Sequence, residues 1–294
     1  MRTVFLGTSS FAVAVLERLA GSEHRPVLVV TRPDRPRGRG RRVSPPPVAE
    51  AARELGIEVR QPGSVNDDDA RAMVASVHPD VLCVCAFGAL IKEPLLSEYP
   101  MLNVHPSLLP RWRGAAPIER AIMAGDERTG VSIMRMTAGL DSGPVCSGQS
   151  EPIGPEDTYG TLAPRLAALG GELLLRTLDT EPPCAEQDDS LATYAEKIAP
   201  EDRMLDPLRP AWELERVVRA LSPHIGAGVE LEDGTRLGVL KARALDGEGR
   251  PGRLLVLDGS RPVIQCAEGR LELLLVKPPG RREMGGQDWL RGLR

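Results

Sequence analysis

Short apolar segments that alternate with helical patterns constrain the fold of this chain more than any other feature. Residues 3–6, 26–30 and 80–87 are each largely apolar without polar alternation, and helical patterns separate them. A strand that is apolar on both faces is typical of a parallel sheet covered by helices on both sides. We therefore predict a doubly wound, mostly parallel α/β sheet of the Rossmann-like type, with its ligands at the carboxyl ends of the strands.

The pattern changes near residue 181. Residues 181–204 contain Pro182-Pro183 and clusters of acidic residues, which favour a linker. After a helix around Trp212 to Leu221, short strands follow, with a hairpin signal at Asp233-Gly234. Several short strands with glycine-rich turns predict a small OB-like β-barrel. The expected domains are residues 1–180 for the catalytic sheet, 181–204 for the linker and 205–294 for the barrel.

Composition indicates a globular protein. The chain has 294 residues, 41% of them hydrophobic, and a net charge of -4. It contains no apolar run long enough for a membrane span, and its first residues do not predict a signal peptide, so we expect a cytoplasmic protein. The five cysteines are scattered along the sequence, and we expect them to be reduced thiols. Pairs of Cys or His at the spacing of zinc ligands are missing, so the sequence does not predict a zinc site.

Three common nucleotide and hydrolase motifs are missing. The first strand ends at Gly7-Thr8-Ser9-Ser10, which lacks the G-x-G-x-x-G pattern that seats a pyrophosphate. The chain also contains neither a P-loop motif nor a G-x-S-x-G nucleophile elbow. The sheet therefore is not expected to bind a nicotinamide or ATP, or to act as a serine hydrolase.

Asn103 and His105 are the first candidates for a site. They lie two residues apart at the end of a predicted strand, so their side chains share a face at the edge where such sheets bind ligands. An amide and an imidazole suit acyl transfer, because both can stabilise an oxyanion and His can shuttle a proton. Asp141, in the loop after a later strand, is expected to reach the same face and orient His105. Taken alone, N-x-H is more often a polar strand end, and Asp141 is compatible with a helix cap.

Larger motifs add a resemblance. The segment 103–110, Asn-Val-His-Pro-Ser-Leu-Leu-Pro, resembles the signature of formyltransferases that use 10-formyltetrahydrofolate, and 140–143 resembles their aspartate motif. Segments 5–8, 33–41, 111–118 and 192–195 resemble the methionyl-tRNA formyltransferase family in particular. The resemblance covers nearly the whole chain.

This resemblance implies a reaction and a set of site residues. The reaction is formyl transfer to the α-amino group of methionine on initiator tRNA, with Asn103 and His105 as oxyanion donors, His105 also as proton shuttle, and Asp141 orienting His105. The folate co-substrate would contact Ser107, Leu108, Leu109 and Pro110, and its pterin would lie along Phe87, Gly88, Ala89, Leu90 and Ile91. No metal is implied. We expect a monomer.

The run 32–42 holds six arginines against one carboxylate. Its prolines and glycines exclude a regular helix, and its position after the second strand places it on the catalytic side of the sheet. Given the resemblance, Arg35, Arg37, Arg39, Arg41 and Arg42 are expected to hold the acceptor stem of the tRNA, with the barrel as a second, weaker surface. Without that context, the run is equally compatible with a solvated basic loop.

Two other interpretations stay open at this point. An amino sugar nucleotide N-formyltransferase would share Asn103, His105 and Asp141 but would not need the arginine run. A non-catalytic RNA-binding protein would explain the arginines but leave the N-x-H pattern and Asp141 without a role.

Overall fold

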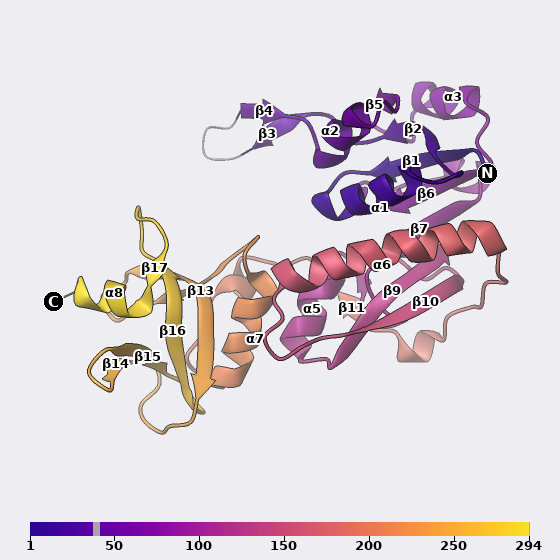
Figure 1. The fold of residues 1–294 in the computed structure, drawn as a ribbon. Coiled ribbons are helices and arrows are strands. Elements are labelled where there is room, and N and C mark those ends of the chain that lie inside the picture. The colour runs from indigo at the N-terminus through magenta and orange to yellow at the C-terminus, as the bar shows by residue number, and fades with distance from the viewer. Residues whose placement is uncertain (38–41, 294) are drawn as a thin grey trace. The chain divides into compact units, whose positions relative to one another are not determined.

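The computed structural model describes residues 1–37 and 42–293 (Figure 1). They pack into two compact units. The first contains residues 1–114, 128–152 and 163–194, and the second contains 115–127, 153–162 and 195–294. The units thus interleave along the chain, unlike the consecutive domains expected from the sequence. The reason is packing within the second unit, where Met123 lies against the core formed by the C-terminal residues.

The first unit is built on a seven-stranded sheet of order β10-β9-β7-β6-β1-β2-β5. The pairs from β5 to β7 are parallel, whereas β9 is antiparallel to both β7 and β10. The predicted doubly wound, mostly parallel sheet is therefore confirmed. Its strands are β1 (Thr3–Gly7), β2 (Pro26–Val30), β5 (Val59–Arg60), β6 (Val81–Cys85), β7 (Met101–His105), β9 (Arg128–Arg135) and β10 (Val145–Pro152).

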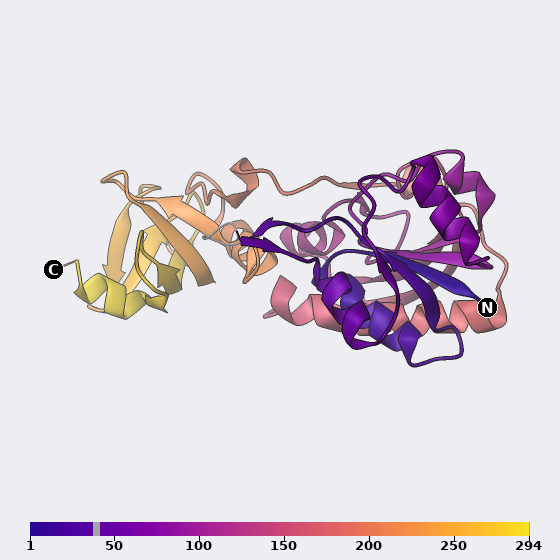
Figure 2. The same ribbon diagram turned by 90° about the horizontal axis from the view of Figure 1, so that it is seen from above.

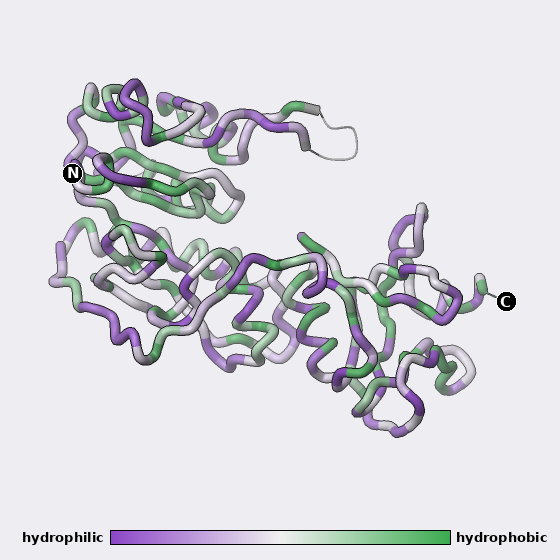
Figure 3. Tube along the Cα trace, turned by 180° about the vertical axis from the view of Figure 1, so that it is seen from behind, coloured by the Kyte–Doolittle hydropathy of each residue, from purple (hydrophilic) through white to green (hydrophobic). Residues whose placement is uncertain are grey.

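Helices cover both faces of this sheet (Figure 2). They are α1 (Ser10–Ala20), α2 (Pro47–Glu54), α3 (Asp68–Ser76), α4 (Leu95–Glu98) and α6 (Tyr159–Thr180), whose last 18 residues, 163–180, pack with the first unit. Leu6 and Leu82 face a core that includes Val74 of α3 and Leu95 of α4. Side chains alternate along a strand, so the residues adjacent to Leu6 on β1 and to Leu82 on β6 point to the other face of the sheet, toward α1, α2 and α6. The central strands are accordingly hydrophobic along their length (Figure 3).

Shorter elements complete the first unit. β3 (Arg35–Arg37) and β4 (Arg42–Ser44) pair antiparallel, with Arg35 opposite Ser44 and Arg37 opposite Arg42. The described residues of the arginine run, 32–37 and 42, are strand or extended chain, in agreement with the expectation that the run is not a helix. The other short elements are β8 (Arg113–Gly114), β11 (Tyr194–Ala195) and the 3-10 turn Asp189–Leu191.

The second unit contains a six-stranded antiparallel sheet of order β12-β13-β16-β15-β14, with β17 paired to β16. The sequence predicted a small OB-like β-barrel, and the structure shows the C-terminal domain of short antiparallel strands. Among the described strands, no pairing joins β12 to β14, so the hydrogen-bonded path is open. Its elements are α5 (Pro117–Ala124), the 3-10 turn Glu201–Arg203, α7 (Ala211–Leu221), β12 (Ala227–Glu230), β13 (Arg236–Leu245), β14 (Leu254–Leu257), β15 (Arg261–Gln265), β16 (Arg270–Lys277), β17 (Met284–Gly285) and α8 (Gly286–Arg291).

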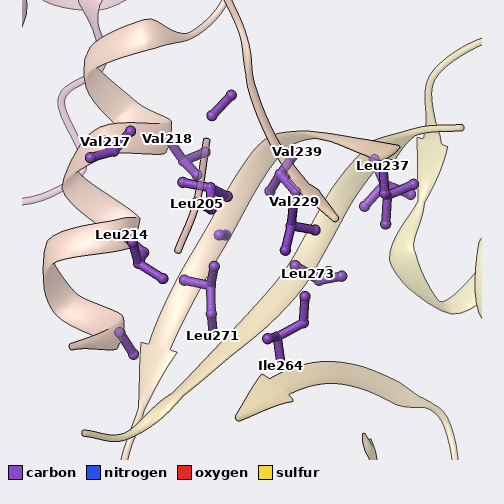
Figure 4. Close-up of a cluster of buried hydrophobic side chains, with 14 of the residues drawn as sticks. Leu205, Leu214, Val217, Val218, Val229, Leu237, Val239, Ile264, Leu271 and Leu273 are labelled. Atoms are coloured by element: carbon purple, nitrogen blue, oxygen red, sulfur yellow. The ribbon is translucent and has the colours of Figure 1, made fainter. Parts of the chain in front are cut away.

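One face of α7 supplies much of this unit's core. Leu214, Val217 and Val218 recur at helical spacing, and all are buried against the sheet. Figure 4 shows Leu214 of this helix pointing toward Leu271 of β16, with Val218 beside Leu205. The apolar side chains that recur along α7 and those that alternate along the strands therefore pack into one apolar layer.

The cysteines correct one expectation. Cys146 and Cys184, 38 residues apart, form a disulfide, whereas the sequence predicted five reduced thiols. The pairing follows from the backbone, because Val145 and Ala185 exchange N–H···O bonds of 2.8 and 2.9 Å and bring the two segments together. Cys83, Cys85 and Cys266 are free and buried, and burial raises the pKa of the Cys83 thiol to about 12. None of the described helices is long and apolar enough to cross a membrane.

Candidate active site

β7 positions the first two candidate residues. Asn103 lies opposite Val84 of β6 and Met134 of β9, and His105 lies opposite Ser132 of β9. Being two residues apart on one strand, the two side chains share a face at the carboxyl end of β7. The His105 side chain is only 5% exposed, whereas Asn103 is half-buried.

Both nitrogens of the His105 ring face polar partners. Nε2 lies 2.9 Å from the carbonyl oxygen of Trp112, and Nδ1 lies 3.6 Å from Oδ2 of Asp141. A carbonyl only accepts hydrogen bonds, so Nε2 must carry a hydrogen. Nδ1 is then a lone pair in the neutral ring and a donor in the imidazolium. At 3.6 Å the carboxylate is too far for a good hydrogen bond but close enough for strong electrostatic attraction to a charged ring.

Asp141 reaches this position from the loop after β9. Its Oδ2 accepts a hydrogen bond of 2.9 Å from the Gly114 N–H, and its side chain is 18% exposed. Its backbone lies in the left-handed region, with φ of +46°, and Trp112 has φ of +63°. Such conformations are costly for residues other than glycine, and they concentrate at functional sites. The structure therefore brings Asp141 and His105 together.

The Asn103 amide is the uncommitted polar group of the site. Among the described residues it forms no hydrogen bond, although the neighbouring groups of His105 and Asp141 do. An amide that is half-exposed at the carboxyl end of a strand is free to donate to a ligand.

The segment 107–110 is held rigidly beneath the site. Ser107 is fully buried, and its hydroxyl donates to the carbonyl of Arg111 at 2.6 Å. The Ser132 hydroxyl donates to the Ser107 carbonyl at 2.8 Å and accepts from the Leu109 N–H at 3.1 Å. Leu108, Leu109 and Pro110 are half-buried. The Ser107 hydroxyl is thus committed to the backbone of this loop, while the other three residues of the predicted folate segment are partly exposed.

The segment 87–91 follows β6 at the same end of the sheet. Phe87 and Ile91 are buried in the hydrophobic core, while Leu90 is 66% exposed. The carbonyls of Phe87, Gly88 and Leu90 accept hydrogen bonds of 2.7, 2.8 and 2.9 Å from the side chains of Thr8, Arg32 and Asn66, respectively. These three bonds fix the loop that was predicted to contact the pterin.

The predicted tRNA-binding arginines are only partly described. Arg35 is exposed on β3, and Arg37 and Arg42 pair through their backbone. Arg39 and Arg41 lie outside the described residues. Arg32, which precedes the hairpin, donates to the Gly88 carbonyl and so connects this segment to the 87–91 loop.

The sequence missed a group of residues that surrounds the site from the expected linker. Gln187 donates to the carbonyls of Asp141 and Gly143, and Arg113 donates to both Gln187 and Asp189. Prolines and acidic residues favoured a linker here, and no local pattern indicated contact with a site.

A cavity of about 370 Å³ lies at the opposite edge of the same sheet. Its lining includes Met1, Asp80 and Met101, at or next to the starts of β1, β6 and β7, together with both disulfide cysteines. It is thus separate from the carboxyl ends that carry His105. Within residues 1–37 and 42–293, no group of three or more His, Cys, Asp or Glu side chains is arranged to hold a metal ion.

Comparison with known proteins matches two consecutive segments of the chain. Residues 1–178 match the family described as formyl transferase, and residues 197–294 match the formyl transferase C-terminal domain. A methionyl-tRNA formyltransferase of Halorhodospira halophila is 43% identical over 302 residues, covering 100% of this chain and 96% of the relative.

Solved structures support the fold. HypX from Aquifex aeolicus in complex with tetrahydrofolic acid has a TM-score of 0.67 at 18% identity, covering 99% of this chain and 47% of that protein. An N-formyltransferase from Helicobacter canadensis, in complex with folinic acid and dTDP-3-aminofucose, has a TM-score of 0.67 at 14% identity, covering 93% of this chain and 98% of that one.

Proposed function

The chain belongs to the formyl transferase family, and on this premise we propose how its residues transfer a formyl group from 10-formyltetrahydrofolate to the α-amino group of methionyl-tRNA. The observation that carries this activity is the 43% identity to a methionyl-tRNA formyltransferase along the whole chain, through both matched domains. The sugar-modifying enzyme is similar in fold alone.

Asn103, His105 and Asp141 are proposed to stabilise the oxyanion that develops when the amine attacks the formyl carbon. As this intermediate collapses, the bond between the formyl carbon and N10 of the folate breaks, the amine loses a proton and N10 gains one, which releases tetrahydrofolate. The unbonded Asn103 amide donates one hydrogen bond. Because Nε2 of His105 is committed to the Trp112 carbonyl at 2.9 Å, Nδ1 is the nitrogen left to serve as donor, and it does so as an imidazolium. Asp141, at 3.6 Å from Nδ1, stabilises that charge and carries protons to and from the ring through water.

The two loops at this edge of the sheet are proposed to hold the folate. Leu108, Leu109 and Pro110 supply apolar surface next to His105, and the braced backbone of 87–91 faces the pterin, as the family resemblance implies. The fully hydrogen-bonded carbonyls at 87, 88 and 90 support a preformed loop. No metal is assigned a role, because the formyl group of the donor is already activated.

The arginine run 32–42 is proposed to bind the acceptor stem of initiator tRNA. Arg35, Arg37, Arg39, Arg41 and Arg42 bring a dense positive charge to a chain of net charge -4. Guanidinium groups bind phosphate oxygens in a bidentate manner and stay charged at any working pH. The C-terminal sheet would provide a second, weaker surface. We propose that the protein works as a monomer in the cytoplasm, where its charged tRNA is made.

The direct test is incubation of the protein with 10-formyltetrahydrofolate and initiator methionyl-tRNA, followed by detection of formyl-methionine. A parallel reaction contains a nucleotide-linked amino sugar in place of the tRNA. We expect product from the tRNA alone. Formylation of the sugar without formylation of the tRNA would establish the sugar enzyme instead, and tRNA binding without any formyl transfer would establish a non-catalytic RNA-binding protein.

A further inference from the structure

The backbone of residues 112–114 forms hydrogen bonds to both His105 and Asp141. The Trp112 carbonyl accepts from Nε2 of His105 at 2.9 Å, and the Gly114 N–H donates to Oδ2 of Asp141 at 2.9 Å. The 3.6 Å separation between Nδ1 and Oδ2 is therefore set by where residues 112–114 lie.

Residues 187–193 hold that segment in turn. The N–H groups of Trp112 and Arg113 donate to the side chain and the carbonyl of Thr193, both at 2.9 Å. The Arg113 side chain, only 4% exposed, donates to Oε1 of Gln187 at 3.0 Å and to Asp189 at 2.7 Å. A buried guanidinium is stable only where such acceptors surround it.

Gln187 also holds the Asp141 loop directly. Its Nε2 donates to the carbonyl of Asp141 at 2.9 Å and to that of Gly143 at 2.7 Å. Both amide hydrogens and the amide oxygen are thus engaged, and each part of the amide meets the partner that its chemistry requires. Asp141 needs this support, because its left-handed backbone persists only where neighbouring contacts maintain it.

We infer that Gln187 is a positioning residue for formyl transfer, joining the Asp141 loop to the Arg113 segment so that the carboxylate keeps its place beside His105. Gln187 itself lies behind Asp141 and acts through it. The inference rests on the proposed roles of His105 and Asp141. It assigns to the segment between the two matched domains a part in the chemistry.

The first experiment compares Gln187→Ala and Gln187→Glu with the control Gln149→Ala, an exposed glutamine on β10. We expect kcat of both Gln187 variants to fall by about 10- to 100-fold, since small misplacement of a catalytic group has large effects on rate. The KM values for folate and methionyl-tRNA should change less than about twofold, because no binding contact is removed. Glu keeps the acceptor for Arg113 but lacks the two donors, so its failure to restore kcat would identify the donors as the essential part. Wild-type kcat in either variant would overturn the inference.

The second experiment is a double-mutant cycle with Asp141→Asn. If Gln187 acts through Asp141, Gln187→Ala should lower kcat less than about threefold further in the Asp141→Asn background. A full additional loss there would show a general structural role and overturn the inference, while leaving the proposed function intact. Unchanged kcat in Asp141→Asn alone would instead refute the proposed role of Asp141. Melting curves establish that each variant is folded, and Gln187→Glu, which preserves volume, keeps the test valid if the alanine variant does not fold.

Discussion

Histidines lie next to carboxylates in both units, and one pair from each, His105–Asp141 in the first and His224–Glu119 in the second, are built differently. In the first, Nδ1 of His105 lies 3.6 Å from Asp141, beside an amide that has no partner among the described residues. In the second, Nε2 of His224 lies 2.9 Å from Oε1 of Glu119, and the ring stacks on Tyr159 with centroids 3.6 Å apart. The first pair is thus too far apart for a good hydrogen bond, whereas the second is joined by a short one and packed against an aromatic ring.

The difference shows what distinguishes a reactive pair from a structural one. A short, closed hydrogen bond holds the His224 ring in place, and the stacked Tyr159 covers one of its faces. Burial, and then the charge of Glu119, raise the pKa of Tyr159 to about 12, so its hydroxyl stays protonated and neutral at working pH. A histidine that must exchange protons needs the opposite arrangement, with a carboxylate near enough to stabilise charge and room for a substrate atom.

The largest expected effect comes from breaking the first pair. Alanine at Asn103, His105 or Asp141 should each lower turnover at least about 100-fold while the protein stays folded, since each removes transition-state stabilisation. Steady-state formylation assays measure this, with His224→Ala as the matched histidine control. Losses below about tenfold in all three variants, with the fold intact, would place the chemistry elsewhere.

The next largest effect concerns folate binding, which should not depend on the second pair, His224 and Glu119. Binding to the native state stabilises it by about 2.7 kcal/mol when the ligand is at 100 times its Kd. We therefore expect a folate ligand to raise the Tm of the wild type and of His224→Ala by similar amounts, and NAD and ATP to have no effect. The measurement is a thermal melt with each ligand. Stabilisation by a dinucleotide but not by folate would contradict the assignment.

The second pair should matter for stability rather than for rate. His224→Ala removes a hydrogen bond and leaves Glu119 buried without its partner, so the free energy of unfolding should fall by about 1–3 kcal/mol. Urea unfolding measures this, with His78→Gln, at an exposed histidine, as control. Activity per folded molecule should persist. A variant of wild-type stability that had lost its activity would move His224 into the site.

The smallest expected effect per residue concerns the arginine run 32–42, which belongs to neither histidine–carboxylate pair. Changing Arg39, Arg41 and Arg42 to alanine should weaken methionyl-tRNA binding and flatten its salt dependence by about 0.7–0.9 log units for each lost phosphate contact. Binding measured at several salt concentrations tests this, and His105→Ala and His224→Ala should keep the wild-type slope. Equal slopes in the triple variant would show that the arginine run is only a solvated surface.

Patterns within single segments predicted much of the fold. Continuous apolar strands predicted the parallel sheet, and strand-end geometry predicted that Asn103 and His105 share a face. The change to short strands with glycine-rich turns predicted the antiparallel C-terminal sheet. The Asp141 loop was expected near His105, and the structure places it there.

Long-range hydrogen bonds were not predictable in the same way. Arg113 and Gln187 are 74 residues apart, and their contact leaves no periodic trace in either segment. The disulfide between Cys146 and Cys184 was missed for the same reason. The packing of residues 115–127 with the C-terminal unit was also missed, because chain order suggested consecutive domains.

The bracing of the site by residues 187–193 has a consequence for the order in which the protein matures during synthesis. All seven strands of the first sheet are complete by residue 152, so the sheet can form while the ribosome is still adding α6. Trp112 and Arg113 nevertheless wait for Thr193, 81 residues after Trp112, before their backbone is anchored. A nascent chain ending near residue 180 therefore contains every strand of the first sheet but lacks the residue that anchors Trp112 and Arg113. The enzyme becomes competent only when translation has passed beyond the sheet that carries its chemistry.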